Sequence, residues 1–210
     1  MSDEENVEKL KEWWRENGRA VIAGLVIAVG GVVGWQQWGA YQDRQAEAAS
    51  VAYMHFIEAR ETGADADTIA RRGQRVLDDH GSTIYASMAG LQLADFQADA
   101  TDGEGAAETL RWVIEQGEDK SFRDLARLRL AQIHYGDDDL DEALSVLDGA
   151  EDGPYEARYQ ELRGDIHAAR GERDRARSAY EAALAAEELQ QGRRSLIELK
   201  LNDLGGEVSA

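Results

Sequence analysis

Residues 164–184, GDIHAARGERDRARSAYEAAL, carry the pattern that decides the fold. Ala176 lies 12 residues after Gly164 and Ala183 lies 19 residues after it, while the bulky Tyr180 lies 16 residues after it. A small residue lets a neighbouring helix approach closely, and a bulky residue fills the space beside it. Gly171 divides the stretch into two helical segments, so the pattern predicts two antiparallel helices in close contact.

The same frame occurs twice upstream. Its first position holds Ala131 or Ala94, and the later positions hold Ala143, Leu147 and Ala150 in one copy and Ala106, Leu110 and Val113 in the other. The three frames start 37 and then 33 residues apart, close to the roughly 34-residue period of tetratricopeptide repeats. Residues 164–184 also resemble the tetratricopeptide consensus, although Gln160 and Arg163 stand where that consensus prefers Trp and Leu. We expect these small and bulky residues to pack the repeats together.

Helical segments separated by Gly or Asp fill the region around the frames. No segment competes convincingly as a β-strand, and Pro occurs only once in the chain. The sequence therefore predicts an all-α fold, in which residues 63–210 form a tetratricopeptide-like α-solenoid of antiparallel helix pairs. The expected helices cover 67–80, 82–100, 105–116, 120–135, 139–147, 154–170, 173–187 and 194–204.

One long apolar stretch lies near the N-terminus. Residues 20–42 contain no charge, and residues 20–38 approach the roughly 20 residues that a helix needs to cross a bilayer. Tryptophans lie on both sides of the stretch, as in the aromatic belts at membrane interfaces. A cleaved signal peptide is disfavoured, because the small-x-small motif at 46–48 lies well beyond the apolar core and follows charged residues. We expect a single N-terminal transmembrane helix.

Basic residues predict the orientation of this helix. They are concentrated before the span, whereas Arg44 alone follows it closely; the preceding ones are Lys9, Lys11, Arg15 and Arg19. The N-terminus is therefore expected in the cytoplasm and the remainder outside it, in the periplasm of a Gram-negative bacterium. The expected location is the bacterial inner membrane, in a single pass.

Two further segments flank the span. Val7, Leu10 and Trp14 recur at helical spacing, so residues 1–19 are expected to form a cytoplasmic amphipathic segment, broken at Asn17 and Gly18. Apolar residues keep the same rhythm after the span, which predicts a helix over 39–62 that extends from the membrane. Within the span, Gly30 and Gly34 form a G-x-x-x-G pair, a pattern typical of close contact with another transmembrane helix.

Composition excludes several functions. The chain has 210 residues, of which 42 are acidic and 23 basic, and its net charge is −19. Because it has no basic stripe longer than two adjacent arginines, nucleic-acid binding is not expected. The chain has no cysteine, which removes disulfides, thiolate metal sites and a cysteine nucleophile. The acidity indicates a solvated surface, to which salt adaptation is an additional explanation.

Candidate chemical sites have structural explanations. His134 and His167 hold a position where repeats prefer a packing side chain, while His55 and His80 lack partners at metal-ligand spacing. The acidic run at 136–142 lacks the central glycine and distal glutamate of a calcium loop, and helix capping explains it. We expect no catalytic residues, no metal site, no cofactor and no enzyme activity. A solenoid instead offers a concave surface for peptides or proteins.

The chain as a whole resembles the ancillary SecYEG translocon subunit family. The resemblance rests on residues 16–38, on YASMAGLQLA at 85–94, on LRLAQI at 128–133, on residues 162–184 and on ELKLNDL at 198–204. It implies a bacterial inner-membrane protein with a periplasmic tetratricopeptide-like domain. It also implies association with the SecYEG translocon and with periplasmic chaperones or secreted clients, and no catalytic residues.

These features lead to one main hypothesis and one alternative. The main hypothesis is a membrane-anchored periplasmic adaptor at the translocon, which binds chaperones or clients during secretion and envelope protein folding. The alternative is a scaffold for envelope or respiratory-complex assembly or for cell division, unrelated to secretion.

Overall fold

The computed structural model describes residues 3–149, 153–186, 189 and 191–205. These residues form helices and no strands, which confirms the predicted all-α class. Residues 1–47 and 48–210 form two separate units, and α1 runs through both of them. The helices are α1 (Asp3–Glu61), α2 (Ala66–His80), α3 (Ile84–Asp99), α4 (Gly103–Gln116), α5 (Lys120–Gly136), α6 (Leu140–Asp148), α7 (Glu156–Ala169), α8 (Arg173–Ala185) and α9 (Gln191–Asp203).

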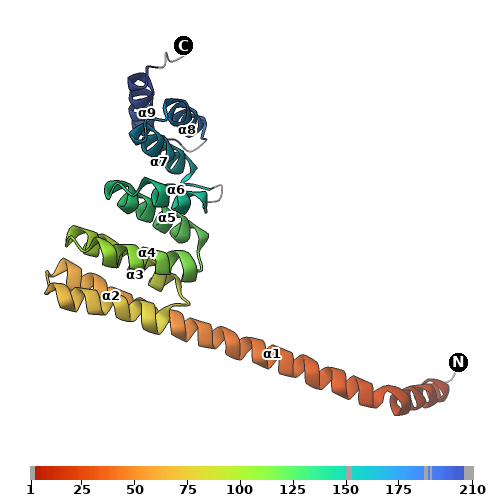
Figure 1. Ribbon diagram of the computed structural model, residues 1–210. Coiled ribbons are helices and arrows are strands. Elements are labelled where there is room, and N and C mark those ends of the chain that lie inside the picture. The colour runs from red at the N-terminus through yellow and green to blue at the C-terminus, as the bar shows by residue number, and fades with distance from the viewer. Residues whose placement is uncertain (1–2, 150–152, 187–188, 190, 206–210) are drawn as a thin grey trace. The chain divides into compact units, whose positions relative to one another are not determined.

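The second unit is a stack of helix pairs. Figure 1 shows α3 with α4, α5 with α6, and α7 with α8 as successive hairpins, followed by α9. The end of α1 belongs to this unit and pairs with α2, because Phe56 and Ala59 share a buried cluster with Ile69 and Val76. This arrangement confirms the predicted tetratricopeptide-like solenoid of antiparallel helix pairs.

The turns inside the four pairs share one backbone geometry. Each contains a residue with positive φ, namely Gly63, Thr101, Asp138 or Gly171. The next residue donates its N–H to the carbonyl five residues upstream, as in Asp102 to Gln97 (2.9 Å) and Glu172 to His167 (2.9 Å). This is the Schellman motif that ends helices by a left-handed residue. A common turn therefore sets the same connection between the two helices of every pair.

The side chains expected to pack the repeats are buried within them. Gly164 lies inside α7, and the ring of Tyr180 covers it so closely that a Cβ built on Gly164 would lie 2.4 Å from a ring carbon. The other residues of the three frames are at most 3% exposed: Ala94, Ala106, Leu110, Ala131, Ala143, Leu147, Ala176, Tyr180 and Ala183. Ala150 lies outside the described residues.

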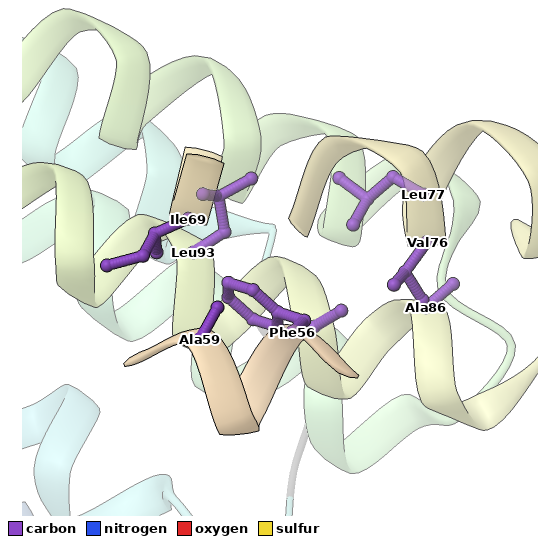
Figure 2. Packing of buried hydrophobic residues seen from close by; sticks show 8 residues of the cluster. Phe56, Ala59, Ile69, Val76, Leu77, Ala86 and Leu93 are labelled. Atoms are coloured by element: carbon purple, nitrogen blue, oxygen red, sulfur yellow. The ribbon is translucent and has the colours of Figure 1, made fainter. Parts of the chain in front are cut away.

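The first pair reverses the order of small and bulky residues. Phe56 lies seven residues before the positive-φ Gly63, just as Gly164 lies seven residues before Gly171. The small partner is Gly73 on α2, where a Cβ would lie 3.0 Å from the Phe56 ring. Figure 2 shows the Phe56 ring between Ile69 and Leu93 on one side and Val76 and Ala86 on the other. Close helix contact is therefore kept with the opposite assignment of sizes.

Candidate functional site

The apolar part of α1 is exposed along its length. Among the described residues, one helix is long and apolar enough to cross a membrane, at 22–61, and none of its most apolar 18-residue window is buried. Large apolar side chains here are 50–80% exposed, and they include Ile22, Leu25, Val26, Ile27, Val29, Val32, Val33, Trp35 and Trp38. So much exposed apolar surface requires lipid or another helix to cover it.

Gly30 and Gly34 lie on this exposed helix. A Cβ built on either glycine would meet no heavy atom within 4 Å. Both glycines follow the ordinary helical backbone, so neither is needed for a left-handed conformation. The position is open to the close approach of a second helix, which is the use that small residues have in membranes.

The predicted helix break at Asn17 and Gly18 is wrong. Both residues lie inside α1, which is continuous from Asp3 to Glu61. The Asn17 side chain donates to the carbonyl of Trp13 (3.1 Å), and the indole of Trp14 lies against Gly18. An internal glycine costs only about 1 kcal/mol, and helix-forming residues on both sides keep the helix intact. Figure 1 shows that α1 changes direction close to its N-terminal end.

The two candidate histidines link the two helices of a pair. His167 Nδ1 lies 2.7 Å from an oxygen of Glu172, and His134 Nδ1 lies 3.6 Å from an oxygen of Asp139. In both cases the acid is the residue after the positive-φ turn residue, at the start of the second helix. The pairs therefore fasten the turn. No group of three or more His, Asp or Glu side chains suited to a metal ion occurs in the part of the chain that the structure describes.

Glu172 makes the turn of the α7–α8 pair sensitive to acid. Its hydrogen bond with His167 lowers the pKa of its carboxyl group below 4.5, and Arg175 contributes in the same direction. A lowered folded-state pKa stabilises the fold above the unfolded-state pKa, and this contribution is lost as the pH falls through the folded-state value. We predict that Glu172→Gln flattens the decline of Tm between roughly pH 5 and pH 3, measured by circular dichroism. Glu181→Gln, an exposed change in the same helix, is the control; equal slopes in both variants would contradict the assignment.

A charged cluster that the sequence analysis did not predict joins α7 to α9. Glu161 is 5% exposed, and its carboxylate accepts hydrogen bonds from Lys200 (2.9 Å) and Arg193. Lys200 also donates to both oxygens of Asp165 (2.8 Å), which accepts from the Tyr180 hydroxyl (2.7 Å). Two carboxylates and two cations thus satisfy one another in a largely buried place.

The repeat frame contains the signal that would have revealed this cluster. Glu161 lies three residues before Gly164, and the same position holds Leu128 before Ala131 and Leu91 before Ala94. Both leucines are buried, at 2% and 5% exposure. An acid at a position that is otherwise apolar and buried requires a cationic partner.

Comparison with known proteins agrees with this architecture. The tetratricopeptide repeat-like domain family matches residues 11–206, which include most of α1 and all of the helix pairs. The chain belongs to this family. The family match thus treats the apolar helix and the repeats as one continuous unit of sequence.

Individual relatives confirm the resemblance to the ancillary SecYEG translocon subunits. Proteins of that name from Haemophilus influenzae and Escherichia coli K12 are 29% and 28% identical to this chain, over 97% of its length. The alignments cover 98% and 97% of those two proteins. The ancillary SecYEG translocon subunit of Neisseria gonorrhoeae is 25% identical over 97% of the chain.

Proposed function

We propose that the protein is a single-span adaptor of the bacterial inner membrane that acts at the SecYEG translocon. One observation carries the proposal: relatives named as ancillary SecYEG translocon subunits align with this chain from end to end, through both the apolar helix and the repeats. The tetratricopeptide repeat-like fold supports a binding role rather than a catalytic one.

In this proposal residues 20–38 cross the membrane with residues 1–19 in the cytoplasm, and residues 39–62 extend the helix away from the bilayer. The repeats of 63–210 then lie in the periplasm. The excess of Lys and Arg before the span supports this orientation. Alkaline phosphatase fused after Ala210 should be active, and green fluorescent protein fused at the same site should be dark. An intact phosphatase fusion without activity, together with fluorescence, would overturn the orientation.

The open glycine face of α1 is the proposed contact with helices of the translocon. Gly30→Leu with Gly34→Leu places two bulky side chains where a neighbouring helix needs close approach. We expect at least a fivefold loss of SecYEG co-purified from detergent-solubilised membranes. Val29→Leu with Val33→Leu has the same spacing on another face of the helix and is the matched control. Unchanged recovery with the glycine variant would locate the contact elsewhere.

The repeats are proposed to bind periplasmic chaperones or secreted clients. Stacked helix pairs offer a long surface at which partners bind without forming a catalytic pocket. Membrane anchoring would raise the concentration of such partners where proteins leave the channel. Whole-cell crosslinking from surface positions of α3, α5 and α7 should capture chaperones or translocating clients. Capture of cell-division or respiratory proteins alone, without any secretion component, would support the scaffold alternative instead.

A further inference from the structure

Helix α9 packs on α7 as α5 packs on α3. Lys200 of α9 contacts the side chains of Glu161 and Asp165, which lie four residues apart on α7. Arg129 of α5 donates to the carbonyl of Leu91 (3.1 Å) and pairs with Asp95 (3.0 Å), which lie four residues apart on α3. These are the same frame positions on α3 and α7, because each acid directly follows the small residue of its frame.

The apolar contacts repeat with the charged ones. Ile197 lies three residues before Lys200 and is fully buried, and Ala126 lies three residues before Arg129 and is also fully buried. Leu204 packs on the last buried cluster in the way that Ile133 packs on the cluster of α4 and α5. Helix α9 therefore takes the place of the first helix of a further pair, and Figure 1 shows it at the end of the stack.

The next face of α9 has the residues of a repeat junction but no helix on it. In α3, α5 and α7 the residue three before the small frame residue is Leu91, Leu128 or Glu161, and each is at most 5% exposed because the next first helix covers it. The equivalent residue of α9 is Leu199, directly before Lys200, and it is 57% exposed. Leu196, one turn earlier, is 44% exposed.

An exposed acid accompanies these leucines. Asp203 lies four residues after Leu199, as Asp95 lies four residues after Leu91. Asp95 pairs with the arginine of the following first helix, whereas Asp203 is exposed to solvent. Leu196, Leu199 and Asp203 thus form a surface, the α9 face, that matches the part of α3 on which α5 lies.

We propose that the α9 face is a docking site for an amphipathic helix of a partner protein. The helices that cover equivalent faces define the chemistry of that partner: a small or aliphatic residue, followed three residues later by Arg or Lys, as in α5 and α9 themselves. The base pairs with Asp203, and the apolar residue covers Leu199. A basic partner also suits a chain whose net charge is −19.

A second copy of this chain is a poorer occupant. Its own open first helix is the end of α1, where Val51 and Met54 are 50% and 64% exposed. Met54 lies two residues before Phe56 and so takes the position that Arg129 has before Ala131. A second α1 would bring no base to Asp203 and would add the acidic Glu58 beside it. The proposal does not depend on association with the translocon.

The test measures peptide binding by the full-length chain in detergent. The probe is a fluorescein-labelled, stapled peptide of residues 120–136, KSFRDLARLRLAQIHYG, which is the segment that covers the equivalent face of α3. Fluorescence anisotropy should show that Leu196→Ser with Leu199→Ser weakens binding at least tenfold. Val51→Ser with Met54→Ser, at the other open end, should leave the affinity within twofold.

A charge exchange tests the predicted ion pair. The peptide with Arg129→Glu should bind the natural chain at least fivefold more weakly, and Asp203→Arg in the protein should restore its binding. Circular dichroism checks that the surface variants keep their helices. Equal peptide affinity with and without Leu196 and Leu199 would overturn the proposal. So would sedimentation showing self-association of the natural chain that the two serine substitutions abolish, because a second copy would then occupy the face.

Discussion

Gly164→Ala is expected to lower the free energy of unfolding by about 1–3 kcal/mol, the usual cost of overpacking a well-filled core. The new Cβ would lie 2.4 Å from two carbons of the Tyr180 ring. That ring cannot easily move, because it is 3% exposed and its hydroxyl donates to Asp165 (2.7 Å). The measurement is urea denaturation of the detergent-solubilised chain, followed by far-UV circular dichroism.

Two further variants separate overpacking from a general effect of alanine. Gly136→Ala adds the same methyl group at an exposed helical position with no atom within 4 Å, and it should be neutral or stabilise by up to about 1 kcal/mol. Gly164→Ala with Tyr180→Leu recreates the pairs Ala131–Leu147 and Ala94–Leu110 of the other repeats. The double variant should be more stable than the sum of its single changes predicts, by about 1 kcal/mol or more. Additive effects would contradict the packing explanation.

The helix pairs were predictable because their signals are local. Small residues at fixed spacing, with Gly or Asp between helices, placed the segments within a few residues of their observed limits. Thr101 and Asp138 show the limit of reading turns from glycine, since both adopt positive φ in the same turn as Gly63 and Gly171. The common frame, rather than the residue type, fixes the turn.

The first helix pair was harder to predict because sequence comparison assumes that each position keeps its size. Phe56 and Gly73 exchange the bulky and small roles, so the frame contains no matching letters even though its packing is preserved. The end of α1 therefore appeared as an extension from the membrane instead of part of the first core. Packing complementarity depends on the sum of two side chains, and one position alone does not record it.

The charged junction between α7 and α9 was missed for a different reason. Glu161 and Lys200 are 39 residues apart, and each is an ordinary surface residue type for a helix. Only the frame shows that Glu161 replaces a buried leucine. The α9 face follows from the same comparison, because Leu199 differs from Leu91 and Leu128 in exposure and not in residue type.

Lys200→Met is expected to destabilise the repeat unit by about 2–4 kcal/mol, since it leaves buried carboxylates short of a cation. The value stays below that of a fully buried pair because Lys200 is 27% exposed and Arg193 still reaches Glu161. Burial alone raises the pKa of Glu161, but hydrogen bonds from Lys200 and Arg193 outweigh it and the net pKa is lowered. The stabilisation is therefore present above the unfolded-state pKa and lost as the pH falls through the folded-state value. The gap between Lys200→Met and the natural chain should shrink in acid, which urea denaturation at several pH values would measure.

A triple variant tests whether the loss comes from unpaired charge or from lost packing. Between α5 and α7 the equivalent junction is apolar: Leu128 and Leu162 share one buried cluster, beside the neutral Gln132. Glu161→Leu with Asp165→Gln and Lys200→Leu copies that junction onto α7 and α9. Because buried ion pairs are often replaced by apolar contacts at little cost, the triple variant should recover most of the stability that Lys200→Met loses. Its stability should also be less dependent on pH than that of the natural chain. If the triple variant is as unstable as Lys200→Met at neutral pH, unpaired charge is not the cause, and Lys200 acts instead through the packing of its side chain against Tyr180.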